Sequence, residues 1–150
     1  MKKEALLKKM ESSAEDLILE AEKLTEEEFK TQVITGTWTA KDILSHIAAW
    51  DLVFLDWSSK IVIGEPLSPL PDYHAVNAAE VARRKSLTKE EIANEIRKNR
   101  RAYTEFLAGL TAEQLQLSES RYKFTSESLG HDILAHDVHH LKQIKAFKLK

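Results

Sequence analysis

Three histidines in this sequence combine the residue type and the spacing of a metal-binding site. His136 and His140 are four residues apart, so their side chains lie one above the other if this segment is helical. His46 belongs to a different segment, far upstream. Three neutral imidazoles that converge inside a helical bundle can hold a divalent metal and leave coordination positions open, which is typical of a reactive metal rather than a structural zinc site.

All three histidines fall on apolar helix faces. At about 100° per residue, His140 lies about 40° from His136, and the apolar Ile133 lies about 60° from it. On the upstream helix, Trp50 lies about 40° from His46 by the same count. Inward-facing imidazoles are therefore predicted at these three positions.

The alternative is that each histidine is a core residue hydrogen-bonded to a neighbour, which is the more common situation for one inward histidine alone. Three together favour a metal, because buried imidazoles without partners are costly and a shared ion satisfies all of them. The residue after His136 is Asp137, so the zinc-protease motif H-E-x-x-H is absent. The chain has no cysteine, which excludes disulfides, thiolate-bound zinc, iron–sulfur clusters and a cysteine nucleophile.

Four long amphipathic helices are expected to position these side chains. Apolar residues recur at spacings of three and four over residues 3–23, 39–62, 89–109 and 126–148. Helix starts are marked by capping-box patterns at Thr25, Thr39, Thr88 and Thr111. No run alternates with a period of two, so no strands are expected.

The segment 64–87 separates the second and third predicted helices and contains all three prolines. It is too long for a tight turn between helices, so it can carry the chain from one end of a bundle to the other. We therefore expect an all-α fold, a four-helix bundle with one long crossover between helices 2 and 3, as a single domain over residues 1–150. The basic run at 83–85 is interpreted as a solvated patch rather than a carboxylate clamp.

Composition narrows the possible partners. The 150 residues carry a formal net charge of −2, and the aromatic residues do not alternate with basic ones. Neither feature favours nucleic acid or an anionic membrane surface, so we expect no nucleic-acid partner and no membrane partner. No stretch approaches the roughly 20 apolar residues of a membrane span, and the N-terminus lacks the pattern of a signal peptide, so a cytoplasmic location is expected.

Two separated motifs carry a resemblance to a known family. The first is W-T-x-x-D-x-L-x-H-I-A-x-W over residues 38–50, and the second is H-D-x-x-H-x-x-Q-I over residues 136–144. Together they resemble the DinB/YfiT-like superfamily of four-helix-bundle metalloenzymes, and most closely the branch of ClbS/DfsB-like proteins. The segment 77–84 also resembles that branch.

The resemblance implies a site and a chemistry. His46, His136 and His140 match the positions of the family's metal ligands. Gln143, one turn beyond His140, matches the glutamine of the family's H-x-x-Q motif. No carboxylate on the first or third predicted helix is expected to face inward, so water would complete the coordination. Zinc or nickel is the expected cofactor, with manganese and iron also compatible with nitrogen ligands. A low-molecular-weight thiol is a further expected cosubstrate, because a thiolate nucleophile cannot come from a chain without cysteine.

The main hypothesis is a divalent-metal-dependent enzyme, either a small-thiol S-transferase or a hydrolase, that acts on a reactive small-molecule electrophile. The resemblance is to a family that includes bacillithiol- or mycothiol-dependent transferases, maleylpyruvate isomerases and hydrolases of reactive compounds. No general base is recognisable beside the histidines, so residues that catalyse the reaction beyond the ligands stay unassigned. The alternative hypothesis is a non-catalytic stress-response or ligand-binding bundle without a functional metal, and a purely structural dimer module is a third. A homodimer is expected in each case.

A hydrophobic or aromatic substrate is expected, because aromatic residues are predicted near the histidines. The predicted walls are Trp50, Phe54, Trp57, Tyr103 and Phe106. A loop around residues 72–74 is predicted to form the rim.

Overall fold

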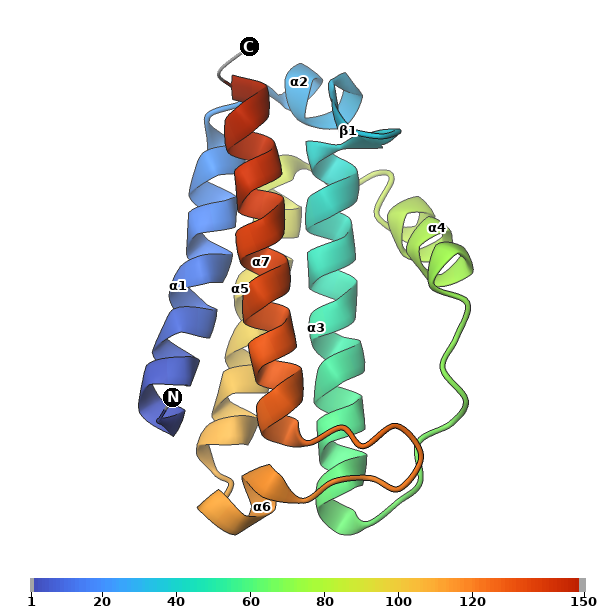
Figure 1. The fold of residues 1–150 in the computed structure, drawn as a ribbon. Helices are drawn as coiled ribbons and strands as arrows, with labels where there is room; N and C mark the ends of the chain where they lie inside the picture. The colour runs from blue at the N-terminus through green and yellow to red at the C-terminus, as the bar shows by residue number, and fades with distance from the viewer. Residues whose placement is uncertain (1, 149–150) are drawn as a thin grey trace.

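The computed structural model describes residues 2–148, which form a bundle of four long helices (Figure 1). These helices are α1 (Lys3–Glu22), α3 (Ala40–Ile63), α5 (Lys89–Ala108) and α7 (Ser126–Lys148). Each lies within one residue of the range that the apolar spacing predicts. The all-α fold class is therefore confirmed. Across the described residues, every helix is too short or too polar to cross a membrane.

The crossover is also confirmed. Helices α1 and α7 run toward one end of the bundle, and α3 and α5 run toward the other (Figure 1). Because α3 and α5 are parallel, the chain between them must return along the outside of the bundle. This return begins where Gly64 ends α3 with a left-handed backbone (φ 77°), and it contains a helix that the sequence pattern did not predict, α4 (Tyr73–Arg83). Asp72 caps α4 by accepting hydrogen bonds from the backbone N–H groups of His74 and Ala75.

All four predicted capping boxes form. Thr39 and Thr88 begin α3 and α5, while Thr25 and Thr111 begin two short helices, α2 (Glu26–Thr31) and α6 (Ala112–Gln116). In each box the threonine hydroxyl accepts from a backbone N–H three residues on, and the side chain there accepts from the threonine N–H. Asp42 is this partner of Thr39.

The expectation of no strands is wrong. A small antiparallel hairpin pairs β1 (Val33–Thr35) with β2 (Trp38–Thr39). Gly36 lies in its turn with φ 55°, a conformation that side chains other than glycine rarely adopt. Strands this short give no period-two signal. The hairpin matters because it places Trp38 beside the start of α3.

A buried ionic network crosses the bundle and was not predicted. The guanidinium of Arg100 on α5 donates to Asp51 on α3 (3.0 and 2.9 Å) and to Asp137 on α7 (2.6 and 3.2 Å). Ser13 on α1 donates to the same Asp137 at 2.6 Å. All four side chains are buried. Polar groups from the four long helices therefore meet in the interior, where each needs the others to offset its loss of hydration.

The interpretation of the basic run at residues 83–85 as a solvated patch is wrong for Arg84. Its side chain is buried, with 1% of its surface exposed. It donates to Glu80 on α4 at 2.7 Å and to Glu95 on α5 at 2.8 and 2.6 Å. Glu95 is half-buried. This contact fixes the C-terminal end of α4, a helix that the sequence pattern did not predict, to α5.

Candidate metal centre

The three histidines lie together between α3 and α7. The Nε2 atom of His46 is 2.8 Å from Nε2 of His136, which is 3.0 Å from Nε2 of His140. One nitrogen from each ring lies within 4.8 Å of the others, a spacing at which the three could hold one ion. His46 and His140 are buried and His136 is half-buried. The sequence pattern therefore predicted correctly that these side chains converge.

Asn77 on α4 determines which nitrogen of His46 carries the proton. The Nε1–H of Trp50 donates to Oδ1 of Asn77 at 2.7 Å. An indole N–H can only donate, so this atom of the amide must be its oxygen. The same oxygen is 2.8 Å from Nδ1 of His46. Nδ1 of His46 must then be the donor, and the neutral ring presents the lone pair of Nε2 to the other two histidines.

Gln143 is the corresponding amide partner of His140. Its Oε1 is 2.7 Å from Nδ1 of His140, and its amide nitrogen is 3.2 Å from Nε2 of His139. With Nδ1 of His140 as the donor, the lone pair of its Nε2 also points at His136. Gln143 thus lies beside His140, as the sequence predicts.

This arrangement fits a cation better than a hydrogen-bond network. Two lone pairs face Nε2 of His136, and a neutral imidazole can donate only one proton from that atom. One lone pair is therefore left without a donor among the three rings. A divalent ion accepts all three lone pairs at once.

The three imidazoles are kept neutral by their surroundings. Burial lowers the pKa of His46 to about 4, against a smaller opposing effect of the hydrogen bond to Asn77. Burial and repulsion from the neighbouring histidines lower the pKa of His136 to about 3. Burial also lowers the pKa of His140. Neutral rings at neutral pH leave their lone pairs available to a metal.

Two further elements hold the site in place. The indole of Trp38, brought by the hairpin, lies edge-on to His46 with ring centroids 5.1 Å apart and nearly parallel to His140 at 6.4 Å. Asp137, the residue after His136, belongs to the buried Arg100 network. That network fixes the turn of α7 from which His136 projects.

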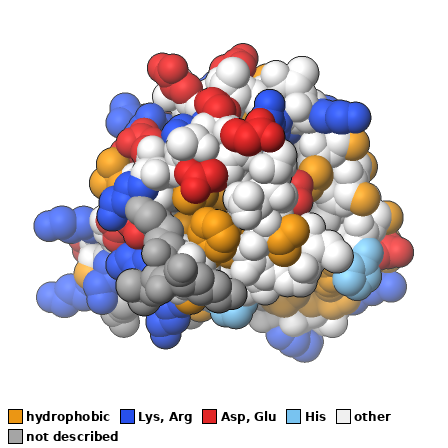
Figure 2. Space-filling model, turned by 90° about the horizontal axis from the view of Figure 1, so that it is seen from above, with side chains coloured by type: hydrophobic (Ala, Val, Ile, Leu, Met, Phe, Trp, Pro, Cys, Tyr) orange, Lys and Arg blue, Asp and Glu red, His pale blue; other side chains and the backbone are white. Residues whose placement is uncertain are grey.

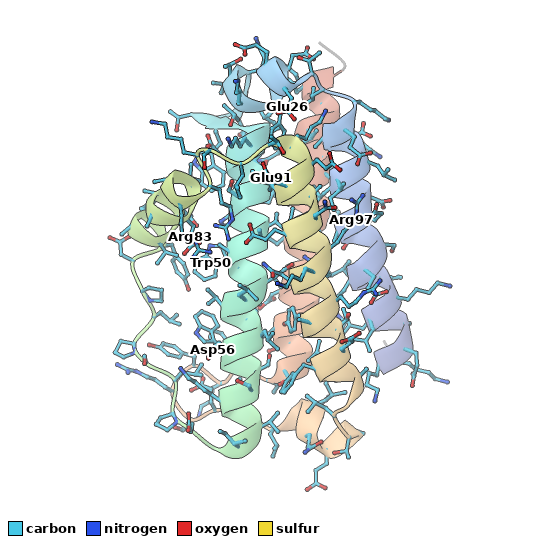
Figure 3. The ribbon with its side chains drawn as sticks, turned by 180° about the vertical axis from the view of Figure 1, so that it is seen from behind. Glu26, Trp50, Asp56, Arg83, Glu91 and Arg97 are labelled. Atoms are coloured by element: carbon cyan, nitrogen blue, oxygen red, sulfur yellow. The ribbon has the colours of Figure 1, made fainter. Side chains whose placement is uncertain are left out.

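A cavity of about 350 Å³ opens beside the histidines. Trp50, Phe54 and Trp57 line it as predicted, and Tyr73 lines it as a predicted rim residue, although in the first turn of α4 rather than in a loop. Figure 3 labels Trp50 on the side of α3 that faces α4.

The predicted walls Tyr103 and Phe106 are wrong. They project from α5 into a separate core cluster with Leu6 and Met10 of α1. The sequence pattern missed several residues that do line the cavity, among them Asn77 and Phe124. Neither belongs to an apolar stripe of a long helix, so only the fold reveals their place.

The sequence matches the profile of the DinB superfamily over residues 9–144. The chain belongs to the DinB superfamily. No curated protein sequence matches it. DfsB and ClbS are among the solved structures of similar fold, so the expected likeness to these proteins holds for the fold.

Three solved structures illustrate how closely this DinB-superfamily protein shares its fold with others. An uncharacterised protein from Clostridium difficile 630 superposes with a TM-score of 0.83 at 15% identity, covering 99% of this chain and 96% of that one. DfsB, described as a sibling lethal factor precursor, gives 0.81 at 17% identity, covering 99% and 95%. The colibactin self-resistance protein ClbS, in complex with double-stranded DNA, gives 0.81 at 13% identity, covering 97% and 94%.

The ClbS complex corrects one expectation. We expected no nucleic-acid partner from the net charge and the spacing of the aromatic residues. A protein of the same fold is in complex with double-stranded DNA, so that exclusion is wrong. Net charge reports the sum over a surface and not the local arrangement that contacts a phosphate backbone.

Proposed function

We propose that this DinB-superfamily protein is a divalent-metal-dependent enzyme whose metal is held by His46, His136 and His140, with water completing the coordination. The observation that carries the proposal is the convergence of the Nε2 atoms of His46 and His140 on Nε2 of His136. The cavity beside this point supplies room for a small-molecule substrate. Zinc or nickel suits an all-imidazole ligand set.

The proposed reaction is transfer of a small thiol to a reactive electrophile, or hydrolysis of that electrophile. A bound divalent ion would polarise the electrophile and favour the anionic form of a coordinated water or thiol. The chain's own residues prepare the site: Asn77 and Gln143 hold the protons on the outer ring nitrogens, and Trp38 covers the histidines on one side. A thiolate would come from a small-molecule cosubstrate, because the sequence has no cysteine.

Metal content of tag-free protein tests the proposal. We expect about one divalent ion per chain, lost in His136→Ala, because a site of three nitrogen ligands binds much more weakly with two. His131→Ala is the matched control. It lies on the same helix and pairs only with Glu127 at 3.7 Å, so it should retain the metal.

Failure to take up zinc, nickel or manganese on titration of the purified protein would refute the enzyme proposal. The alternative, a ligand-binding or stress-response bundle without a functional metal, would then stand.

A second candidate function is binding of double-stranded DNA, which the ClbS complex supports. The net charge of −2 and the engagement of Arg84, Arg97 and Arg100 by carboxylates make strong binding less favourable. Seen from the end that carries α2 and the hairpin, acidic and basic side chains are both spread over the surface (Figure 2). We expect weak binding that falls steeply with salt, measured by fluorescence anisotropy of a labelled duplex. An unchanged anisotropy at low salt would remove this candidate.

A further inference from the structure

Aromatic rings form most of the wall of the cavity beside the histidines. Trp50, Phe54 and Trp57 come from α3, Tyr73 from α4, and Phe124 from the segment before α7. Phe54 and Trp57 are stacked at 5.3 Å and 25°, and Trp57 and Phe124 at 5.9 Å and 12°. These contacts fix the rings relative to one another, so the cavity has an ordered aromatic wall that suits an apolar molecule with aromatic character.

The cavity has one charged wall residue, Asp132 on α7. Within residues 2–148 no lysine or arginine lines this cavity, and Asp132 lines it from an exposed position beside His131. The other polar side chains in the wall belong to His46, His136 and Asn77, which are neutral as described above. A carboxylate beside electron-rich ring faces attracts a positive group and repels an anion.

The position of Asp132 separates its charge from the proposed metal. It precedes His136 by one helical turn, which corresponds to about 6 Å along the helix axis. A positive group paired with Asp132 would therefore lie away from the three nitrogens, while the rest of a small planar molecule could reach them.

We propose that the cavity selects a planar, apolar organic cation, whose positive group pairs with Asp132 and whose electrophilic centre faces the three histidines. This inference names the substrate class for the proposed function and rests on it. Apart from the proposed metal, no lysine or arginine of residues 2–148 in the wall offers an anion a positive partner, so anions are disfavoured in the metal-free protein.

Three probes of matched shape test the inference by isothermal titration calorimetry at neutral pH: 9-aminoacridine, which is cationic, acridine, which is neutral, and acridine-9-carboxylate. In protein stripped of metal, we expect the cation to bind about tenfold more tightly than the carboxylate, from one ion pair and its contacts with ring faces. Asp132→Asn should weaken 9-aminoacridine about fivefold and leave acridine within about twofold.

Two variants serve as controls. Asp132→Glu keeps the charge and should keep the preference for the cation. Asp56→Asn removes a carboxylate from the outer face of α3, where it pairs with Lys60 at 3.0 Å, and should change nothing. Equal affinity for the three probes, binding of none of them, or an unchanged ratio in Asp132→Asn would overturn the inference.

Each titration is run on protein stripped with a chelator and on protein loaded with zinc, which separates the two proposals. A preference for the cation in a protein that takes up no metal would support this inference and refute the enzyme. Metal uptake without that preference would leave the enzyme proposal in place and overturn the substrate class.

Discussion

At the scale of single residues, the site depends on an amide whose two partners fix its orientation. Asn77 accepts from Trp50 and from His46 through one oxygen atom. Trp50 cannot reverse its role, so it orients the amide, and the amide orients the imidazole. Residues that fix the tautomer of a metal-binding histidine typically change metal affinity by about 10- to 100-fold when they are lost.

Asn77→Leu is therefore expected to weaken zinc binding by about 10- to 100-fold while the protein stays folded. The reason is that His46 would lose the acceptor that holds its proton on Nδ1. Competition with a chromophoric chelator measures the affinity. Asn94→Leu is the control, because Asn94 is an exposed residue of α5 that contacts Arg97. Equal zinc affinity in Asn77→Leu and Asn94→Leu would contradict this role.

At the scale of helices and strands, the sequence predicted the elements that depend on interactions between residues close in the chain. The four long helices follow from apolar spacing and capping boxes, and their convergence brings the histidines together. Helix α4 has no buried residue, so it lacks the apolar stripe that reveals a helix in sequence. The hairpin is too short to show alternation. Asn77 and Trp38 lie on these two elements, and their contacts with the histidines could not be predicted. Tyr73 was predicted as a rim residue, but in a loop rather than in a helix.

The ion pair of Arg84 with Glu95, which fixes α4 to the bundle, should make the stability of the protein depend on pH. Hydrogen bonds from Arg84 lower the pKa of Glu95 below its ordinary value of 4.5. The folded state therefore favours the carboxylate. The resulting stability is complete above about pH 4.5 and is lost as the pH falls through the folded pKa.

Glu95→Gln is expected to cost about 1–2 kcal/mol at pH 7, since the pair is half-buried and Arg84 keeps Glu80 as a partner. Urea denaturation of both proteins at pH 7 and at pH 3.5 measures the difference in unfolding free energy. It should shrink at the lower pH, where Glu95 of the wild type is increasingly protonated in both states. A difference that stays constant with pH would show that the carboxylate's charge is not involved.

At the scale of the whole molecule, Arg100 links two apolar core clusters that are otherwise separate. One cluster packs around Ile18, Ile47 and Ile96, and another around Met10, Tyr103 and Leu107. Arg100 lies between them in sequence on α5 and reaches Asp51 and Asp137 on the two helices that carry the histidines. The sequence gives no sign of this network, because its members are isolated charges whose partners are brought together only by folding.

Replacing Arg100 with methionine should destabilise the protein by about 3–5 kcal/mol, because two buried carboxylates lose their shared counter-ion. Arg101→Met, at the exposed neighbouring position, should change the unfolding free energy by less than about 0.5 kcal/mol. Chemical denaturation monitored by circular dichroism compares the two. Similar losses for both variants would mean that the network contributes little to the fold.

The outside route of the crossover has a consequence for how such a protein can diversify. The bundle keeps its core and its histidines, while one outer wall of the cavity belongs to a helix without buried residues. Most positions of α4 do not pack in the core, so they can accept substitutions that would destabilise the fold at buried positions of the bundle. New ligand preferences can arise by changing this one segment, provided that Asn77 and the Arg84 anchor persist. The bundle holds the histidines, and α4 supplies the part of the cavity wall whose sequence can change and so alter which ligand binds.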